Sequence, residues 1–509
     1  MTRSRATRAL PLAFLAVFFA LPVATLLLGH VRPGAVADVI TDASLRRVAW
    51  FTLWQACAST VLTLLVGLPA TWALSVFTFR GAGVLHGMLT VPFLMPGVVV
   101  ATGVLAVVPQ RGVGSILWAH VVFNTAVVLR VVGPRWAMVG NDTLDAAADL
   151  GATPLRAFTG ITWPAIRTAV INAATLVFVF CFGSFAVISI LGGVSTRTLE
   201  TEVFTQAVRL GDIRTATALT VVQTVIVLCV LALNRAQRAE IPAIPAAPRT
   251  PGTHTPRLVA ALAALIVFAP IAAVVHRSFR HGGTFTLAGY RALFDGTLGS
   301  VGINMAHVLR TSASFAAITV LIAVPLSWAA THRTRTTHTE RLSLAPLLVS
   351  SVTLGLGIIV TFDHSPINWR ASSLLVPVIH AVIALPLAVR VIGPARRAVD
   401  PHLYECAADL GADRFTTWRT VELPLLRPAL ARAAGISAAV SLGEFGATSF
   451  LTRGDSMTIP IAIGQLMGRP GPLLQQSGYA IAAVMVIALT LISSSGLTDR
   501  GTGFNRSGK

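Results

Sequence analysis

Long apolar runs alternate with short polar segments along the whole chain. An apolar run of about 18–25 residues is long enough to cross a bilayer as an α-helix. The pattern therefore predicts an all-α, polytopic membrane protein with about twelve transmembrane helices. The predicted spans cover residues 10–28, 50–77, 87–108, 113–132, 168–191, 214–233, 258–275, 308–330, 342–361, 371–391, 429–451 and 478–496.

Residues 234–257 interrupt this pattern near the middle of the chain. The stretch contains five prolines, which preclude a continuous helix because proline lacks the backbone N–H and clashes with the preceding turn. We interpret it as a cytoplasmic linker. It divides the chain into two membrane domains of six spans each, residues 1–233 and 258–509.

The two halves carry an internal repeat. Residues 120–191 align without gaps with residues 380–451, and 22 of the 72 positions are identical. Shared apolar composition does not explain the polar and glycine matches, which include His120/His380, Arg130/Arg390, Gly183/Gly443 and Ser189/Ser449. Both copies follow the same number of spans, so the repeat is parallel rather than inverted.

A polar island occurs at the same place in each half. The first island runs from Asp145 to Pro164 and the second from Glu405 to Pro424, within the loops 133–167 and 393–428. Each predicts a short helix that ends at a glycine suited to left-handed backbone, then a second short helix, then a proline that starts the next span. Two similar islands suggest two docking points for one two-fold partner. The alternative is that each island is a cytoplasmic loop helix that binds no partner.

Composition and charge agree with a membrane protein. The chain is 54% hydrophobic and 12% charged, with a mean hydropathy of +0.75; a soluble protein has about 25% charged residues. The net charge of +19 comes from arginines beside the membrane ends, and no separate basic face favours nucleic acid. The excess of arginine in the loops on one side of the membrane places both termini and both islands in the cytoplasm, although Arg46, Arg47 and Arg197 lie on the opposite side.

The residue inventory excludes several kinds of chemistry. The only lysine is Lys509, so a phosphate-binding P-loop and a Schiff-base enzyme are both excluded. No metal-ligand spacing occurs among Cys57, Cys181, Cys229 and Cys406, which we interpret as small buried hydrophobic residues. We predict no catalytic, cofactor-binding or metal-binding residue in this chain. The apolar N-terminal run favours a retained first span over a signal peptide.

Polar residues inside or beside the spans are candidate functional groups. Glu444, whose repeat mate is Ser184, either lines the translocation path or is a hydrogen-bonded group that holds helices together. We expect interhelical hydrogen bonds, rather than a metal site, from His120, Asn124 and His380. The external acids either dock a binding protein or lie on a solvated loop; they are Glu200, Glu202 and Asp212.

The islands resemble the coupling motif of permease subunits in bacterial binding-protein-dependent ABC importers, which is Glu-Ala-Ala, then Gly, then Ile-x-Leu-Pro. Departures from this pattern are Asp145 for Glu, Cys406 for Ala, Val421 for Ile and Trp163 for Leu. The matching positions are Asp145, Ala146, Ala147, Gly151, Ile161 and Pro164 in the first half and Glu405, Ala407, Gly411, Val421, Leu423 and Pro424 in the second.

The resemblance implies the function and the partners. A separate ATP-binding subunit, expected as a homodimer that holds ATP-Mg, would dock on the islands, and an extracytoplasmic protein would deliver the substrate to this multi-pass protein of the bacterial inner membrane. The fused halves resemble thiamine and ferric-iron permeases. Residues 180–186 and 191–193, His120 with Phe123 and Asn124, and residues 198–200 look most like the thiamine type, which implies thiamine or a phosphorylated thiamine. Residues 441–446 resemble both types. An ion-coupled secondary transporter, with Glu444 as its coupling group, is a more distant alternative.

Overall fold

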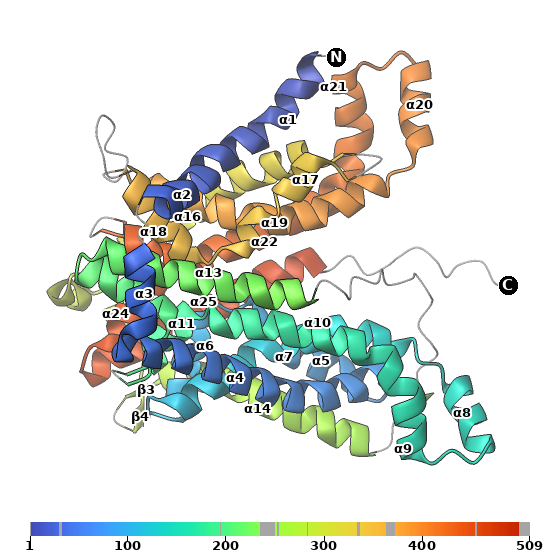
Figure 1. Ribbon diagram of the computed structural model, residues 1–509, viewed down its shortest axis with the longest axis horizontal. Coiled ribbons are helices and arrows are strands. Elements are labelled where there is room, and N and C mark those ends of the chain that lie inside the picture. The colour runs from blue at the N-terminus through green and yellow to red at the C-terminus, as the bar shows by residue number, and fades with distance from the viewer. Residues whose placement is uncertain are drawn as a thin grey trace. The chain divides into compact units, whose positions relative to one another are not determined.

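The computed structural model describes residues 2–29, 33–193, 195–234, 250–251, 254–281, 283–332, 336–362, 372–453 and 456–497. Most of the predicted linker, together with Arg333 and Arg335 after the eighth predicted span, lies outside these ranges. Within them the chain is almost entirely helical, with two short two-stranded pairings (Figure 1). The all-α prediction is confirmed.

The chain divides into two compact units that do not follow the two sequence halves. Unit 1 comprises Met1–Val31, Leu293–Ala462 and Ile487–Lys509, and unit 2 comprises Arg32–Ala292 and Ile463–Val486. The first span of each half therefore packs in the unit formed mainly by the other half. The limits 1–233 and 258–509 stay a prediction about the sequence repeat.

Unit 1 is built around the second half of the chain. Its elements are α1 (Thr2–Leu15), η1 (Ala16–Ala20), α2 (Leu21–Ala24), η2 (Thr25–Gly29), η7 (Thr297–Val301), α16 (Met305–Ala330), α17 (His338–Leu342), η8 (Ala345–Leu348), α18 (Ser351–Phe362), α19 (Leu375–Arg397), α20 (Pro401–Asp409), α21 (Arg414–Thr417), η10 (Trp418–Glu422), α22 (Leu423–Gly443) and α23 (Gly446–Leu451). Helices α24 (Ile459–Gly468) and α25 (Pro472–Leu497) continue from one unit to the other.

Unit 2 is built around the first half. Its elements are α3 (Pro33–Thr41), α4 (Ala43–Val76), β1 (Phe77–Thr78), α5 (Ala82–Thr90), η3 (Val91–Leu94), α6 (Gly97–Val107), α7 (Val113–Ala137), α8 (Asn141–Asp149), α9 (Pro154–Ala157), η4 (Phe158–Thr162), α10 (Trp163–Phe182), α11 (Phe185–Leu191), α12 (Leu199–Phe204), η5 (Thr205–Arg209), α13 (Ile213–Leu233), β2 (Thr250–Pro251), α14 (His254–Ser278), β3 (Arg280–His281), β4 (Thr284–Phe285) and α15 (Ala288–Ala292). Strand β1 pairs in parallel with β2, and β3 pairs antiparallel with β4.

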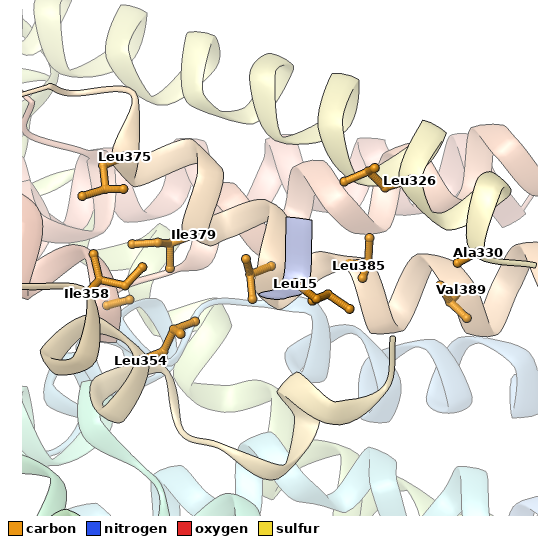
Figure 2. Close-up of a cluster of buried hydrophobic side chains, with 11 residues drawn as sticks. Leu15, Leu326, Ala330, Leu354, Ile358, Leu375, Ile379, Leu385 and Val389 are labelled. Carbon is orange, nitrogen blue, oxygen red and sulfur yellow. The ribbon is translucent and has the colours of Figure 1, made fainter. Parts of the chain in front are cut away.

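A leucine- and isoleucine-rich core holds the N-terminal helix in unit 1. Leu15 of α1 lies among residues of the second half (Figure 2). The cluster draws on α16, α18, α19 and α23, and its buried members are Leu326, Ala330, Leu354, Ile358, Leu375, Ile379, Val382, Leu385, Val389 and Ala447. In a membrane span the alternative to this burial is contact with lipid, so close packing rather than removal from water holds α1 in this unit.

Glycines mark where each exchanged first span packs most closely. In unit 1, a Cβ on Gly357 of α18 would lie 3.0 Å from the carbonyl oxygen of Pro22 in α2. In unit 2, a Cβ on Gly103 of α6 would lie 2.7 Å from the carbonyl oxygen of Pro270 in α14. The two units thus repeat one contact, in which a proline of the exchanged span approaches a glycine of the other half.

The predicted spans are found, but four of them are broken. Among the described residues, ten helices are long and apolar enough to cross a membrane, or up to twelve if two bent pairs each count as one span. The third predicted span bends by 116° between Leu94 and Gly97, and the ninth by 97° between Leu348 and Ser351. The fifth and eleventh begin earlier than predicted and stop at Gly183 and Gly443, where the helix breaks.

Candidate functional site

The first helix of each island ends in the same hydrogen-bonded cap. Gly151 has a φ of +81° and Gly411 a φ of +77°. In the second island the Gly411 N–H donates to the Ala408 carbonyl, and the Ala412 N–H donates to the Ala407 carbonyl, both at 2.9 Å. The first island repeats both bonds. This is a Schellman motif, and it explains why both copies need glycine at this position.

The second helix of each island begins at a side-chain cap. Thr153 Oγ1 accepts from the Arg156 N–H at 3.3 Å, and Asp413 Oδ1 accepts from the Thr416 N–H at 2.8 Å. Hydrogen bonds from Thr416 lower the pKa of Asp413. The bond from the Thr416 side chain has the largest effect, followed by the bond from its backbone N–H. The two caps are equivalent in the repeat, but only the second carries a charge.

We expected the second helix of each island to end before the membrane, but it does not. It runs through a π-helical turn, η4 or η10, into the following span, and the continuous helices are Pro154–Phe182 and Arg414–Gly443. Pro164 and Pro424 lie at the second position after this turn, where a missing N–H leaves an α-helical carbonyl without its donor. The wider turn accommodates the proline without ending the helix.

The islands expose apolar side chains at matching positions. Leu150 and Leu410 directly follow α8 and α20 and are 89% and 88% exposed. Leu155 and Phe415, four residues after the cap glycines, are 72% and 64% exposed. Exposed apolar side chains that gather at one place mark an interaction surface. These four residues lie outside the predicted site; their signal in the sequence is an apolar residue on each side of the glycine.

The predicted motif residues fall into two groups. Exposed positions are Asp145, Ala146, Gly151, Pro164, Glu405, Gly411 and Pro424, and partly or fully buried positions are Ala147, Ile161, Ala407, Val421 and Leu423. Glu405 accepts from, or pairs with, His402 Nδ1 at 3.0 Å on the same helix. Each island thus presents acids and small residues outward while Ala147 or Ala407 faces the protein.

Trp163 is the largest departure from the motif. It is 41% exposed, and its ring lies 6.5 Å from that of Phe158. The second island has an aromatic pair one turn earlier, Phe415 and Trp418, with ring centroids 5.9 Å apart. Each island therefore has two aromatic rings: Phe158 and Trp418 occupy the same position of the repeat, and the second ring is Trp163 in the first island and Phe415 in the second.

The acid Glu444 caps the helix that follows the break in the eleventh span. Its carboxylate accepts from the backbone N–H groups of Ala447 at 2.9 Å and Thr448 at 2.8 Å, and also from the Thr448 hydroxyl. His380 Nε2 lies 3.6 Å from the carboxylate. These contacts give Glu444 a structural role, because they link His380 of α19 to the start of α23. Its repeat mate Ser184 lies at the equivalent break after α10.

Both predicted histidines make interhelical hydrogen bonds. His120 Nδ1 bonds Ser59 Oγ of α4 at 2.8 Å, and His380 Nδ1 bonds Ser441 Oγ of α22 at 2.8 Å. Asn124 Nδ2 donates to the His120 carbonyl at 3.0 Å and contacts Cys181 Sγ at 3.4 Å. The prediction of interhelical bonds is confirmed. Among the described residues, no group of three or more His, Cys, Asp or Glu side chains is arranged to hold a metal.

Two of the predicted external acids are not on a solvated surface. Glu200 is 0% and Glu202 3% exposed. Glu202 pairs with Arg197 at 3.0 Å, and Glu200 accepts from Gln223. A bond from the Leu199 N–H to Thr52 Oγ1 ties the start of α12 to α4, which turns this segment inward. The expectation that both lie free for docking, or in solvent, is wrong.

The third acid is exposed, as a solvated loop predicts, but three of the cysteines differ from expectation. Asp212 is exposed but caps α13 through the Thr215 N–H at 3.0 Å. Of the four cysteines only Cys181 is buried within this chain; Cys57, Cys229 and Cys406 are exposed. The first two lie in predicted spans, where we expect exposed side chains to face lipid.

A second polar cluster lies beside the second island, and sequence reasoning missed it. Glu422, the last residue of η10, is fully buried and lies 2.7 Å from Arg396 Nε at the end of α19. Trp328 Nε1 of α16 donates to the same carboxylate at 3.0 Å. Its only signal in the sequence is a charged residue directly before the Leu-Pro of the motif and two arginines after Gly393-Pro394.

Comparison with known proteins agrees with this architecture. Residues 299–499 match the family described as binding-protein-dependent transport system inner membrane component. The thiamine transport system permease protein ThiP of Brucella abortus is 27% identical over 97% of this chain and 96% of its own length. The chain is thus similar, over nearly its full length, to a permease protein of the binding-protein-dependent transport systems.

Other relatives extend the comparison. ThiP of Salmonella typhimurium is 24% identical over 89% of each chain. The putrescine transport system permease protein PotI of Escherichia coli is 32% identical, but over 33% of this chain and 64% of its own length. The permease is thus a multi-pass inner-membrane protein, as the apolar helices and the family both indicate.

Proposed function

We propose that this permease carries thiamine, or a phosphorylated thiamine, across the inner membrane. The observation that carries the proposal is the similarity to thiamine permeases over nearly the full length of the chain. Similarity to the putrescine permease is confined to a third of the chain. Full-length similarity covers both fused halves of the chain.

The energy for transport comes, in this proposal, from a separate ATP-binding subunit that docks on the two islands. The duplicated cap at Gly151 and Gly411 supports this role, since it presents the same backbone twice. A homodimeric ATPase with ATP-Mg at its own sites offers one groove to each copy. The exposed leucines Leu150 and Leu410 supply apolar contacts for those grooves.

The islands and both chain termini are proposed to face the cytoplasm. The support is the excess of arginine on that side of the predicted spans, including Arg130, Arg156 and Arg167 around the first island. An extracytoplasmic binding protein would deliver the substrate to the opposite face.

Glu444 and Ser184 are the proposed path residues. Each lies where an equivalent span breaks, and irregular backbone at membrane depth is tolerated only inside protein or beside a water-filled cavity. A cationic substrate such as thiamine favours a carboxylate on one side of such a path. The hydrogen bonds that Glu444 makes to α23 give it a structural role as well.

The test is uptake into proteoliposomes that contain the permease, its ATPase and its binding protein. Labelled thiamine, thiamine monophosphate and ferric iron are compared, each with and without internal ATP. The proposal expects ATP-dependent uptake of thiamine or its phosphate that survives collapse of the ion gradients. Uptake of iron alone would favour the ferric-iron permeases, and uptake that follows an ion gradient without ATP would identify a secondary transporter.

A further inference from the structure

Two neighbouring arginines end α19 in unit 1, and each forms an ion pair with an acid on another element. Arg396 Nε lies 2.7 Å from Glu422, and Arg397 Nη1 donates to both oxygens of Glu340 in α17, at 2.9 and 3.0 Å. Arg396 is 8% and Glu422 0% exposed. Charged side chains buried to this extent are stable only when oppositely charged or hydrogen-bonding groups lie close to them.

Trp328 of α16 completes this arrangement. Its indole N–H donates to Glu422 at 3.0 Å, and the Arg396 guanidinium lies 4.5 Å from the centre of its ring. Arg396 Nη1 also donates to the carbonyls of Trp328 at 2.9 Å and Thr331 at 2.8 Å. These carbonyls end α16, where a helix attracts cations. One guanidinium therefore binds the end of α16 and the turn that follows the second island.

We call Trp328, Glu340, Arg396, Arg397 and Glu422 the base network. Gly393, one turn before the arginines, makes room for it: a Cβ there would lie 2.7 Å from Glu340 Oε1 and 3.3 Å from the Arg397 guanidinium. The packing around the network is thus as close as the packing in the helical core.

The first half has the same backbone without these charges. The repeat aligns Arg396 with Trp136 and Glu422 with Thr162, both of which are buried in unit 2. Ala137 occupies the position of Arg397. The first island still has its helix, its glycine cap and its π-helical turn. The fold of an island therefore does not require the ion pairs.

The location of Glu422 suggests what the charges add. It is the last residue of η10, the π-helical turn that connects α20 and α21 to the long helix α22. A bend at this turn would absorb a push on the island. A buried ion pair and an indole hydrogen bond between this turn and two other helices oppose such a bend, because separating them would leave charges unpaired in a dry site.

We propose that Arg396 and Glu422 are positioning residues for coupling: the base network makes the second island a rigid lever on α16 and α19, whereas the first island has uncharged residues at the equivalent positions. The inference rests on the proposed coupling function of the islands. It assigns them unequal mechanical roles in one transport cycle.

The test uses the full permease with its ATPase and binding protein in proteoliposomes. The double variant Arg396→Gln with Glu422→Gln removes both charges together, so no buried charge is left unpaired. Arg419→Gln, an exposed arginine in the same turn, is the matched control. Three quantities are measured: co-purification with the ATPase, ATP turnover, and substrate molecules transported per ATP.

The proposal expects normal co-purification of the double variant and at least a fivefold loss in substrate transported per ATP, with Arg419→Gln unchanged. An unchanged ratio in the double variant overturns it. So does loss of ATPase binding, which would make the pair a docking or folding element, and so does an equal loss from Arg419→Gln. Failure of the proposed function is separate, because it appears as absent ATP-dependent uptake in the unmodified permease.

Discussion

Replacing the cap glycine of either island by alanine tests whether left-handed backbone holds the proposed coupling surface in shape. Gly151 and Gly411 both have positive φ, and a Cβ at either position would meet nothing within 4 Å. The change therefore introduces no clash. Its cost arises only from forcing an L-residue into the left-handed region, about 1–2 kcal/mol.

Part of this cost is offset because alanine also reduces the entropy of the unfolded chain, by about 0.4–1 kcal/mol. A net loss of about 1 kcal/mol shifts the local folding equilibrium roughly fivefold. The shift should appear in the amide of Ala152 or Ala412, whose hydrogen bond to the helix carbonyl is 2.9 Å long. Hydrogen exchange measured by mass spectrometry on the island peptides reports it directly.

We expect Gly411→Ala to raise exchange in the second island about fivefold and to weaken ATPase binding by a similar factor. Gly411→Asn should behave nearly as the unmodified protein, since asparagine tolerates left-handed backbone. Gly160→Ala is the control: Gly160 also has open space around it but lies in a helical turn with ordinary φ. If Gly160→Ala and Gly411→Ala give equal exchange and binding, the argument from φ is refuted.

Three further predictions concern the spans and the second island. Gly103→Ala should destabilise the protein by about 1–3 kcal/mol, measured as a lower thermal midpoint in detergent, because the new methyl group would lie 2.7 Å from the rigid carbonyl of Pro270. Glu444→Ala should cost about 1–3 kcal/mol in the same assay, because two backbone N–H groups of α23 lose their acceptor. Acid should loosen the start of α21 first: bonds from Thr416 lower the pKa of Asp413 below its ordinary value of about 3.8, so the cap is intact above that value and is lost as pH falls through the lowered pKa. Amide exchange across residues 413–418 should therefore rise only when the pH falls to the lowered pKa of Asp413.

Each of these predictions has a control within the same chain. Gly87→Ala places a methyl group in open space on α5 and should leave the thermal midpoint unchanged. An equal fall in both glycine variants would argue against the close contact in α6. Thr153 caps the first island without a titrating group, so a similar acid response there would contradict the assignment to Asp413. For Glu444, lost uptake at unchanged stability would favour a path role over capping.

The sequence predicted the number and approximate positions of the spans because their length and apolar character are local properties. It did not predict the breaks at residues 95–96 and 349–350. Hydropathy does not distinguish a straight span from a bent one, and the evidence for the first bend was a single proline, Pro96, whose predecessor Met95 has extended backbone. Nor did it predict that each first span packs in the opposite unit, since that depends on contacts between residues far apart in sequence.

The island site could be predicted for a similar reason: its motif is short, local and present twice. The glycine cap follows from one residue type at one position. The base network could not be found in this way, because Arg396 and Glu422 are 26 positions apart and Trp328 lies on another helix. The ion-pair partner of a charged residue cannot be identified from the sequence before the helices are packed. Glu422 is therefore indistinguishable in the sequence from any other loop acid.

The two islands share their backbone features where they would meet a partner and differ in charge where they join the membrane helices. The glycine caps, the exposed leucines and the π-helical turns coincide, and an ATPase homodimer with two identical grooves requires such coincidence. The buried attachments differ, with Thr162 in the first copy and Glu422 in the second. A symmetric motor can therefore produce an asymmetric response in one fused chain, since equal displacements act on attachments of different stiffness. Asymmetry of this kind needs no difference at the docking surface, and for that reason a comparison of the motif residues alone would not reveal it.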